Sequence, residues 1–301
     1  MKNDRSAKGF RLLRWLPWLA ALVLVAAYQL FPEGVHRLSQ AVSPSTSQEP
    51  ASSAGSAMPE AAADRVSPPP SSGEAARNTR MAWAQNPRDP QSLLRSNMVE
   101  KQIRARGVDQ KQVLDAMLEV PRHMFVDPNY RGQAYDDQPV PIGWGQTVYQ
   151  PYMVALMTEL LELDGDEKVL EIGTGSGYHS AVLSRVAKEV YTIEINEMLS
   201  RKARKALSSL GYDNVIVREG DGYKGWPEEA PFDAIILTTA PPRIPDPLIE
   251  QLKVGGKMVV PIGGLLQDLQ VLTKNKDGGV SKRTVLPVKV STMTGEVQDK
   301  N

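Results

Sequence analysis

The chain has 301 residues, 41% of them hydrophobic, which is enough to bury one substantial core with an appendage or two small cores. Lysine plus arginine balances aspartate plus glutamate at 35 each, so the overall charge provides no basic field for nucleic acid, and we expect no nucleic-acid partner. Cysteine is absent, and the three histidines (His36, His123 and His179) lack ligand-like spacing, so disulfides, thiolate catalysis and a metal centre are not expected.

The N-terminus combines basic residues with an apolar run. Lys2, Arg5, Lys8, Arg11 and Arg14 precede WLPWLAALVLVAAYQLF, an uncharged stretch over residues 15–31 that is marginally long enough to cross a bilayer. An uncleaved membrane anchor within residues 1–37 is the favoured interpretation. A cleaved signal peptide is the alternative, although no clean small-x-small cleavage site follows the run. The basic residues would place the rest of the chain outside the cytoplasm, in keeping with inner-membrane anchoring or export.

Residues 38–90 are rich in Ser, Ala, Pro and Glu. Such a composition contains too little apolar surface to offset the entropy of ordering, so we predict a disordered linker. A folded domain is expected over residues 91–301. Its first part, residues 91–150, begins with two amphipathic helical patterns, QSLLRSNMVEKQIRARGV and DQKQVLDAMLEV.

A helix is predicted from Pro151, with a core stripe formed by Met153, Leu156, Met157, Leu160 and Leu161. Alternating strands and helices follow. KVLEIG, EVYTIEI, NVIVREG, FDAIILT, KMVVPIG and DLQVLTK read as strands, and KDGG turns into a last strand, RTVLPVKV. Val- and Ile-rich strands separated by helices predict an α/β fold with a mostly parallel seven-stranded sheet that ends in an antiparallel hairpin.

VLEIGTGSGYHS is the most informative stretch, because a buried strand runs into Glu171 and a glycine-rich loop that opens a helix. Its E-x-G-x-G-x-G spacing is typical of S-adenosylmethionine sites, whereas dinucleotide sites use G-x-G-x-x-G. Glu194 ends the second strand, where a carboxylate can accept hydrogen bonds from ribose hydroxyls. Asp221 follows the third strand, where an acidic side chain with neighbouring backbone amides can bind an adenine edge. Separately, glycines are often mere turn formers and a strand-end glutamate is often solvated, but the three signals in register favour a cofactor site.

With these segments the sequence resembles the protein-L-isoaspartate (D-aspartate) O-methyltransferase family over most of residues 94–298. Besides the glycine loop, the resemblance rests on MVEKQIRARGV, VPRHMFVDP, AYDDQPVPIGWGQT, QPYMVALMTELLEL, GDGYKGWPEEAPFDAIILT and LPVKV. It implies a Rossmann-like class I methyltransferase fold. It also implies methyl transfer from S-adenosylmethionine to the carboxylate of isoaspartyl and D-aspartyl residues in damaged proteins, by a cytoplasmic enzyme with a monomeric catalytic domain.

The resemblance also assigns site residues. The implied cofactor residues are Glu171, Gly173, Thr174, Gly175, Gly177, Glu194, Asp221 and Gly222. The implied catalytic residues are Thr147 and Tyr149, in GQTVYQPY, the segment that faces the acceptor carboxylate. Asp136 and Asp137 are interpreted as loop-fixing residues.

The sequence departs from the family at two places. The family usually has a serine where Tyr149 stands, and the resemblance implies that this serine hydroxyl contacts the acceptor carboxylate. Ser291 and Met293 replace a more apolar C-terminal strand. A tyrosine hydroxyl lies several ångströms further from the backbone than a serine hydroxyl, so Tyr149 either reshapes the acceptor pocket or serves only in packing. Alternative functions are therefore methylation of another acceptor, or cofactor binding without catalysis.

Overall fold

The computed structural model describes residues 90–295. The predicted anchor segment, and the linker up to residue 89, lie outside the described residues. Between residues 90 and 295, no helix is both long enough and apolar enough to cross a membrane.

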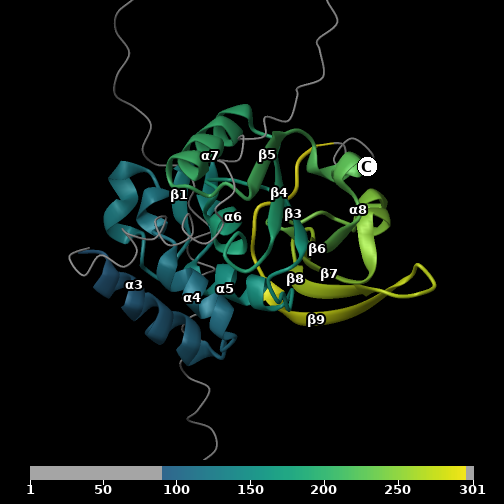
Figure 1. Cartoon of the computed structure of the whole chain (residues 1–301), viewed down its shortest axis with the longest axis horizontal. Helices are drawn as coiled ribbons and strands as arrows, with labels where there is room; N and C mark the ends of the chain where they lie inside the picture. The colour runs from purple at the N-terminus through teal and green to yellow at the C-terminus, as the bar shows by residue number, and fades with distance from the viewer. Residues whose placement is uncertain (1–89, 296–301) are drawn as a thin grey trace, which may run out of the picture. The chain divides into compact units, whose positions relative to one another are not determined.

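Six α-helices and nine strands make up this part of the chain (Figure 1). The helices are α3 (Ser92–Met98), α4 (Lys111–Glu119), α5 (Pro151–Glu159), α6 (Tyr178–Leu183), α7 (Glu197–Ser209) and α8 (Asp246–Gln251). The strands are β1 (Val140–Gly143), β2 (Gln146–Val148), β3 (Lys168–Ile172), β4 (Glu189–Glu194), β5 (Val215–Glu219), β6 (Phe232–Leu237), β7 (Leu252–Gly263), β8 (Gln267–Lys274) and β9 (Val280–Val288).

The main sheet has seven strands in the order β5-β4-β3-β6-β7-β8-β9. The first five are parallel to one another, and β8 and β9 are antiparallel to their neighbours. The predicted mostly parallel sheet with an antiparallel C-terminal hairpin is therefore confirmed. β1 and β2 form a separate two-stranded antiparallel ribbon.

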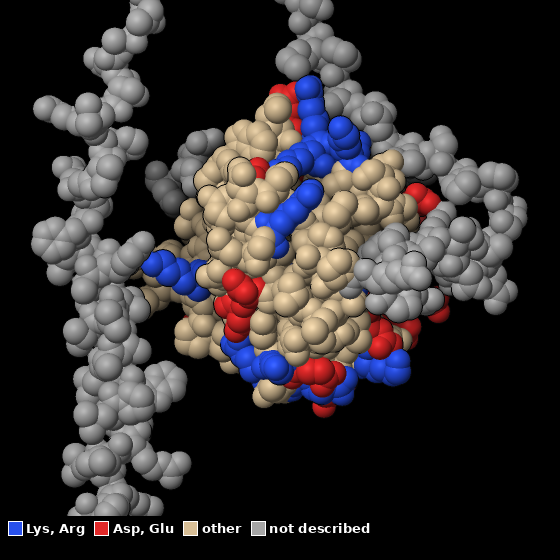
Figure 2. Space-filling view, turned by 90° about the vertical axis from the view of Figure 1, so that its left-hand side faces the viewer, with Lys and Arg blue, Asp and Glu red and all other residues tan. Residues whose placement is uncertain are grey.

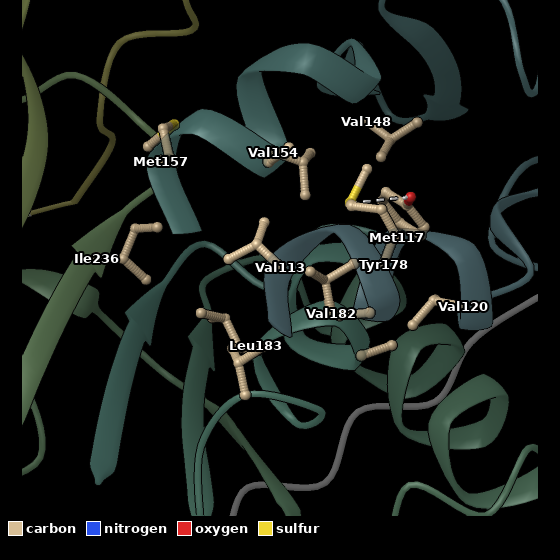
Figure 3. Close-up of a cluster of buried hydrophobic side chains, with 14 of the residues drawn as sticks. Val113, Met117, Val120, Val148, Val154, Met157, Tyr178, Val182, Leu183 and Ile236 are labelled. Atoms are coloured by element: carbon tan, nitrogen blue, oxygen red, sulfur yellow. Dashed lines mark hydrogen bonds between the residues drawn. The ribbon is translucent and has the colours of Figure 1, made fainter. Parts of the chain in front are cut away.

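The two faces of the main sheet are covered by different elements. Along β3, Val169 packs in a core with α4, α5 and α6, whereas the next residue, Leu170, packs in a second core on the α8 side. This alternation follows from the period of two along a strand. Figure 3 shows side chains of the first core meeting between helices and sheet, with the Tyr178 hydroxyl bonded to the Met117 sulfur.

Helix α5 departs in detail from the predicted core stripe. Met157 and Leu161 are buried as expected, but Met153, Leu156 and Leu160 are only partly buried. Their places on the inner face are taken by Pro151, Val154, Ala155 and Thr158. The helix is apolar nearly all round its first two turns, so periodicity alone could not fix its rotation; packing against α4 and α6 decides it.

The first predicted helix is not continuous. After α3 the chain makes a π-helical turn over Val99–Ile103 and a 3₁₀ turn over Arg104–Arg106. Gly107 then ends the helical segment with φ 94°, a conformation that favours glycine.

Candidate active site

A pocket opens at the carboxyl ends of the parallel strands. The chain leaves β3 toward β4 on one side and later returns to β6 on the other, and such a switch point leaves a crevice where α/β sheets bind ligands. The pocket has a volume of about 870 Å³, including its open mouth. Its walls come from the β1–β2 ribbon, the loop after β3, the ends of β4 and β6, and the segment after β9.

The glycine loop after β3 forms the floor of the pocket. Gly173 has φ 96°, and a Cβ atom there would lie 2.3 Å from the Thr238 side-chain oxygen, so only glycine fits. Gly173, Thr174 and Gly175 line the pocket. Gly177 does not; it begins helix α6, and a Cβ there would press on Leu207 at 3.1 Å. The third glycine therefore serves helix packing.

Glu194 is held rigidly at the pocket wall. Its carboxylate accepts hydrogen bonds from the backbone N–H groups of Gly175 at 2.8 Å and Asn196 at 3.0 Å. It is 7% exposed and lines the pocket. A carboxylate has about four acceptor positions, so this one has capacity left for the hydroxyls of a ribose.

Glu171 lies beneath the glycine loop and is not among the pocket-lining residues. Its Oε2 atom accepts hydrogen bonds from the Ser180 and Thr192 hydroxyls, the latter at 2.7 Å. Because Thr192 donates its one proton to Glu171, it accepts from the Thr174 hydroxyl, 2.7 Å away. Burial raises the pKa of Glu171 to about 8. Glu171 thus supports the loop from below, while its neighbours contact the pocket.

The loop after β5 places Gly222 in the pocket wall, where a Cβ would lie 2.3 Å from the Ile172 side chain. Asp221 does not line the pocket. Its carboxylate accepts from the Tyr223 N–H at 2.9 Å and lies beside Gly295. The assignment of Asp221 to an adenine edge therefore stays a prediction.

The β1–β2 ribbon forms another wall of the pocket, and its Ile142 side chain lies against Gly175 of the glycine loop. The side chain of Thr147 is exposed and lines the pocket. Tyr149, just after β2, crosses the pocket margin: its hydroxyl donates a hydrogen bond to the Thr238 carbonyl at the end of β6. Burial raises the pKa of Tyr149, so the phenol stays neutral and its one proton is engaged. Tyr149 both packs against the core and joins two walls of the pocket.

The segment after β9 closes another side. The Ala240 N–H donates a hydrogen bond to the Ser291 carbonyl at 2.9 Å, and the Met293 N–H donates one to the Ala240 carbonyl at 2.8 Å. Met293 is 3% exposed and belongs to the α8-side core, whereas Ser291, Thr292 and Thr294 are exposed at the pocket. The departure from an apolar strand thus gives this wall hydroxyl groups.

The two acidic residues before the ribbon have different surroundings. Asp137 pairs with Arg106 at 2.8 Å, which ties this loop to the N-terminal helical segment. The side chain of Asp136 is exposed. Neither residue lines the pocket.

Thr238, Thr239 and His179 are among the pocket residues that were not predicted from the sequence. Thr238 and Thr239 follow β6 directly, and the rule that strand ends meet at one edge would have found them. His179 lines the pocket from the first turn of α6, with Nε2 3.0 Å from the Thr158 hydroxyl. That hydroxyl donates to the Val154 carbonyl, so it accepts from His179, and Nε2 carries the proton. Burial lowers the pKa of His179 to about 3, and the ring is neutral.

The charges on one face of the described part of the protein are mixed in sign. On the face in Figure 2, Lys and Arg lie beside Asp and Glu around a broad uncharged area, without a continuous basic field on that face. Within residues 90–295, no group of three or more His, Asp or Glu side chains is arranged to hold a metal ion.

Comparison with known proteins identifies similar chains. A family model described as protein-L-isoaspartate (D-aspartate) O-methyltransferase matches residues 94–298. A protein-L-isoaspartate O-methyltransferase 2 of Shewanella sediminis is 58% identical over 185 residues, which are 61% of this chain and 76% of that protein. A protein-L-isoaspartate O-methyltransferase of Gloeobacter violaceus is 51% identical over 201 residues, 66% of this chain and 98% of the other.

Solved structures show the same fold. A protein-L-isoaspartate O-methyltransferase structure superposes with a TM-score of 0.62 and 31% identity, covering 67% of each chain. A structure from Plasmodium falciparum, described as a complex with S-adenosyl-L-homocysteine, has a TM-score of 0.57 and 24% identity, covering 66% of this chain and 97% of that one. The second likeness concerns the fold alone.

Proposed function

The chain belongs to the protein-L-isoaspartate (D-aspartate) O-methyltransferase family. From this we propose how its pocket transfers a methyl group to an isoaspartyl carboxylate. The protein is an S-adenosylmethionine-dependent protein carboxyl methyltransferase that acts on isoaspartyl residues. The observation that carries the residue assignment is that the glycine loop, Glu194 and the ribbon residue Thr147 line one and the same pocket.

The cofactor would lie against the glycine loop. Gly173 and Gly222 line the pocket without side chains, and the fixed Glu194 carboxylate suits ribose hydroxyls. When bound, S-adenosylmethionine supplies an electrophilic methyl group. The chain's own residues would bind the cofactor, orient the acceptor and exclude water.

The acceptor carboxylate would bind at the pocket wall that the β1–β2 ribbon forms. A carboxylate is already a competent nucleophile at neutral pH, so the chain needs to orient one oxygen and exclude water, without a general base. The Thr147 hydroxyl is exposed in the pocket and can donate to that carboxylate. The Tyr149 proton is committed to Thr238, so we assign Tyr149 to holding the wall. This differs from the direct contact implied for the family's serine.

The test compares an isoaspartyl peptide with its normal aspartyl twin, with methyl incorporation followed by mass spectrometry. The wild-type protein is expected to label only the isoaspartyl peptide, and Thr147→Val to lower kcat/KM about tenfold or more through loss of one donor to a charged group. Equal labelling of both peptides would refute the specificity. Thr294→Val, which changes an exposed hydroxyl on another wall, is the matched control.

Attachment to a membrane is a separate proposal about residues 15–31. It is supported by the five basic residues before the uncharged run. Reporter fusions at residue 60 and at the C-terminus would distinguish a cytoplasmic domain, which the family suggests, from an exported one.

The catalytic domain is proposed to act as a monomer, which light scattering on the purified protein would test.

A further inference from the structure

Arg122 is a fully buried cation next to the acceptor wall, and it does not line the pocket. Its Nε atom donates to the Ala134 carbonyl at 2.6 Å, and its Nη2 atom donates to the Tyr149 carbonyl at 2.6 Å. The guanidinium carbon lies 4.8 Å from the centre of the Tyr178 ring, on helix α6. One side chain therefore joins the segment after α4, the loop before β1, the residue after β2 and the helix that follows the glycine loop.

Such a buried cation is costly unless its surroundings compensate it. Removing an arginine charge from water costs several kcal/mol in a protein interior. Here the compensation comes from two short hydrogen bonds to carbonyl dipoles and from the face of an aromatic ring. The charged guanidinium therefore holds two backbone carbonyls in place, those of Ala134 and Tyr149.

Tyr149 is consequently fixed at both of its ends. Arg122 holds its carbonyl, and its hydroxyl bonds to the Thr238 carbonyl beyond β6. Thr147, the proposed donor to the acceptor, lies two residues before Tyr149 in β2. A shift at the Tyr149 carbonyl would therefore move the ribbon relative to the glycine loop.

We propose that Arg122 is a positioning residue for methyl transfer: from behind the pocket, it fixes the ribbon of residues 140–149 at the distance that alignment of the acceptor carboxylate requires. This inference rests on the proposed function. The guanidinium is suited to the task because its planar fork presents Nε and Nη2 to two carbonyls at once, whereas a lysine ammonium is a compact point charge on a flexible stem.

The test uses Arg122→Lys in the full-length protein, with Arg95→Lys as the matched control. Arg95 is also a buried arginine; its Nε donates to the Leu118 carbonyl at 2.6 Å and its Nη1 to the Tyr135 hydroxyl at 3.3 Å. Three quantities are compared: amide hydrogen exchange of residues 146–150, steady-state kinetics on an isoaspartyl peptide, and calorimetric affinity for S-adenosylhomocysteine.

Arg122→Lys is expected to speed exchange of residues 146–150 and to lower kcat/KM for the peptide, each roughly tenfold or more. Affinity for S-adenosylhomocysteine should stay within about twofold, since the glycine loop and Glu194 are untouched. Arg95→Lys should leave the exchange of residues 146–150 unchanged, even if it lowers the melting temperature. Unchanged exchange and kinetics in a folded Arg122→Lys protein would overturn the proposal.

Two further measurements keep the inference testable if Arg122→Lys does not fold. Arg122→Gln retains an amide donor without the buried charge, and it should also loosen residues 146–150. In the wild-type protein without ligand, these amides should be protected, and exchange as fast as in an unstructured peptide would contradict the proposal. A wild-type protein with protected amides but no activity on isoaspartyl peptides would refute the proposed function while leaving the structural role of Arg122 standing.

Discussion

The Tyr149 hydroxyl donates a hydrogen bond to the Thr238 carbonyl, and Thr238 in turn donates its own hydroxyl to the Gly173 carbonyl at 2.7 Å. The residue that stands in place of the family's serine is thereby linked, through the end of β6, to the first glycine of the glycine loop. The two walls proposed to hold acceptor and cofactor are connected by side chains, so a change at position 149 should affect their spacing as well as the pocket's shape.

Removing the Tyr149 hydroxyl should separate these effects. In Tyr149→Phe the ring still packs, but the Thr238 carbonyl loses its partner, so we expect about 1–2 kcal/mol lower stability and a several-fold lower kcat/KM. Urea unfolding and peptide kinetics measure the two quantities. Tyr152→Phe is the control, because Tyr152 is also half-buried and its ring stacks with Arg106. Equal effects of both substitutions would argue against a special role for the Tyr149–Thr238 bond.

Restoring the family's serine tests acceptor choice. Tyr149→Ser removes the ring from the pocket wall and supplies a short hydroxyl near the backbone. A rise in kcat/KM on isoaspartyl peptide would show that Tyr149 has retuned the site toward another acceptor, as considered from the sequence. We expect a fall instead, because the wall loses its connection to Thr238.

Glu194→Ala should weaken S-adenosylhomocysteine binding by about tenfold or more, the cost of a lost charged hydrogen-bond acceptor. The substitution also leaves the Gly175 N–H without its partner in the glycine loop. Isothermal titration calorimetry measures the affinity. Glu197→Ala, three residues later in α7, removes an exposed carboxylate that pairs with Arg201, and it should bind the ligand like the wild type. Undiminished binding in Glu194→Ala would remove Glu194 from the cofactor site.

The buried Glu171 predicts a loss of stability as pH rises from about 4.5 to about 8. Its pKa is raised from 4.5 to about 8 by burial, so between these values the folded protein holds a proton that the unfolded chain has released. The free energy of unfolding should therefore fall as pH rises toward 8, with a slope of at most about 1.4 kcal/mol per pH unit. Urea unfolding from pH 5 to pH 9 measures this slope. Glu171→Gln, which resembles the protonated acid, should flatten it, and an unaltered slope would assign it to other groups.

The buried His179 predicts a contribution to stability that decreases toward acidic pH. Burial lowers its pKa from 6.5 to about 3, so below pH 6.5 the unfolded chain binds a proton that the folded protein does not. The contribution of His179 to stability should fall as pH drops through this interval, and between about pH 4.5 and 6.5 it opposes the contribution of Glu171. His179→Gln keeps an amide that can donate to the Thr158 hydroxyl and should reduce the acid loss. Unfolding midpoints between pH 4 and pH 7 would show whether it does.

Much of the fold and part of the site were predictable, because the relevant signals are local in the sequence. The strand patterns located all seven strands of the main sheet, and the glycine loop located the floor of the pocket. The sequence could not tell that Gly173 lines the pocket while Gly177 serves helix packing, or that Glu171 lies below the loop. Those roles depend on which atoms approach from β6, α7 and β4, elements distant along the chain.

The same division holds for Tyr149. The sequence by itself determined that a tyrosine stands where a serine is usual, in a loop bounded by Gly145 and Pro151, because motif positions need no tertiary contact. Only the tertiary structure decided what the tyrosine does, because the length of its side chain has meaning only relative to a partner. The carbonyl of Thr238, 89 residues later, receives its proton, and Arg122, 27 residues earlier, holds its backbone.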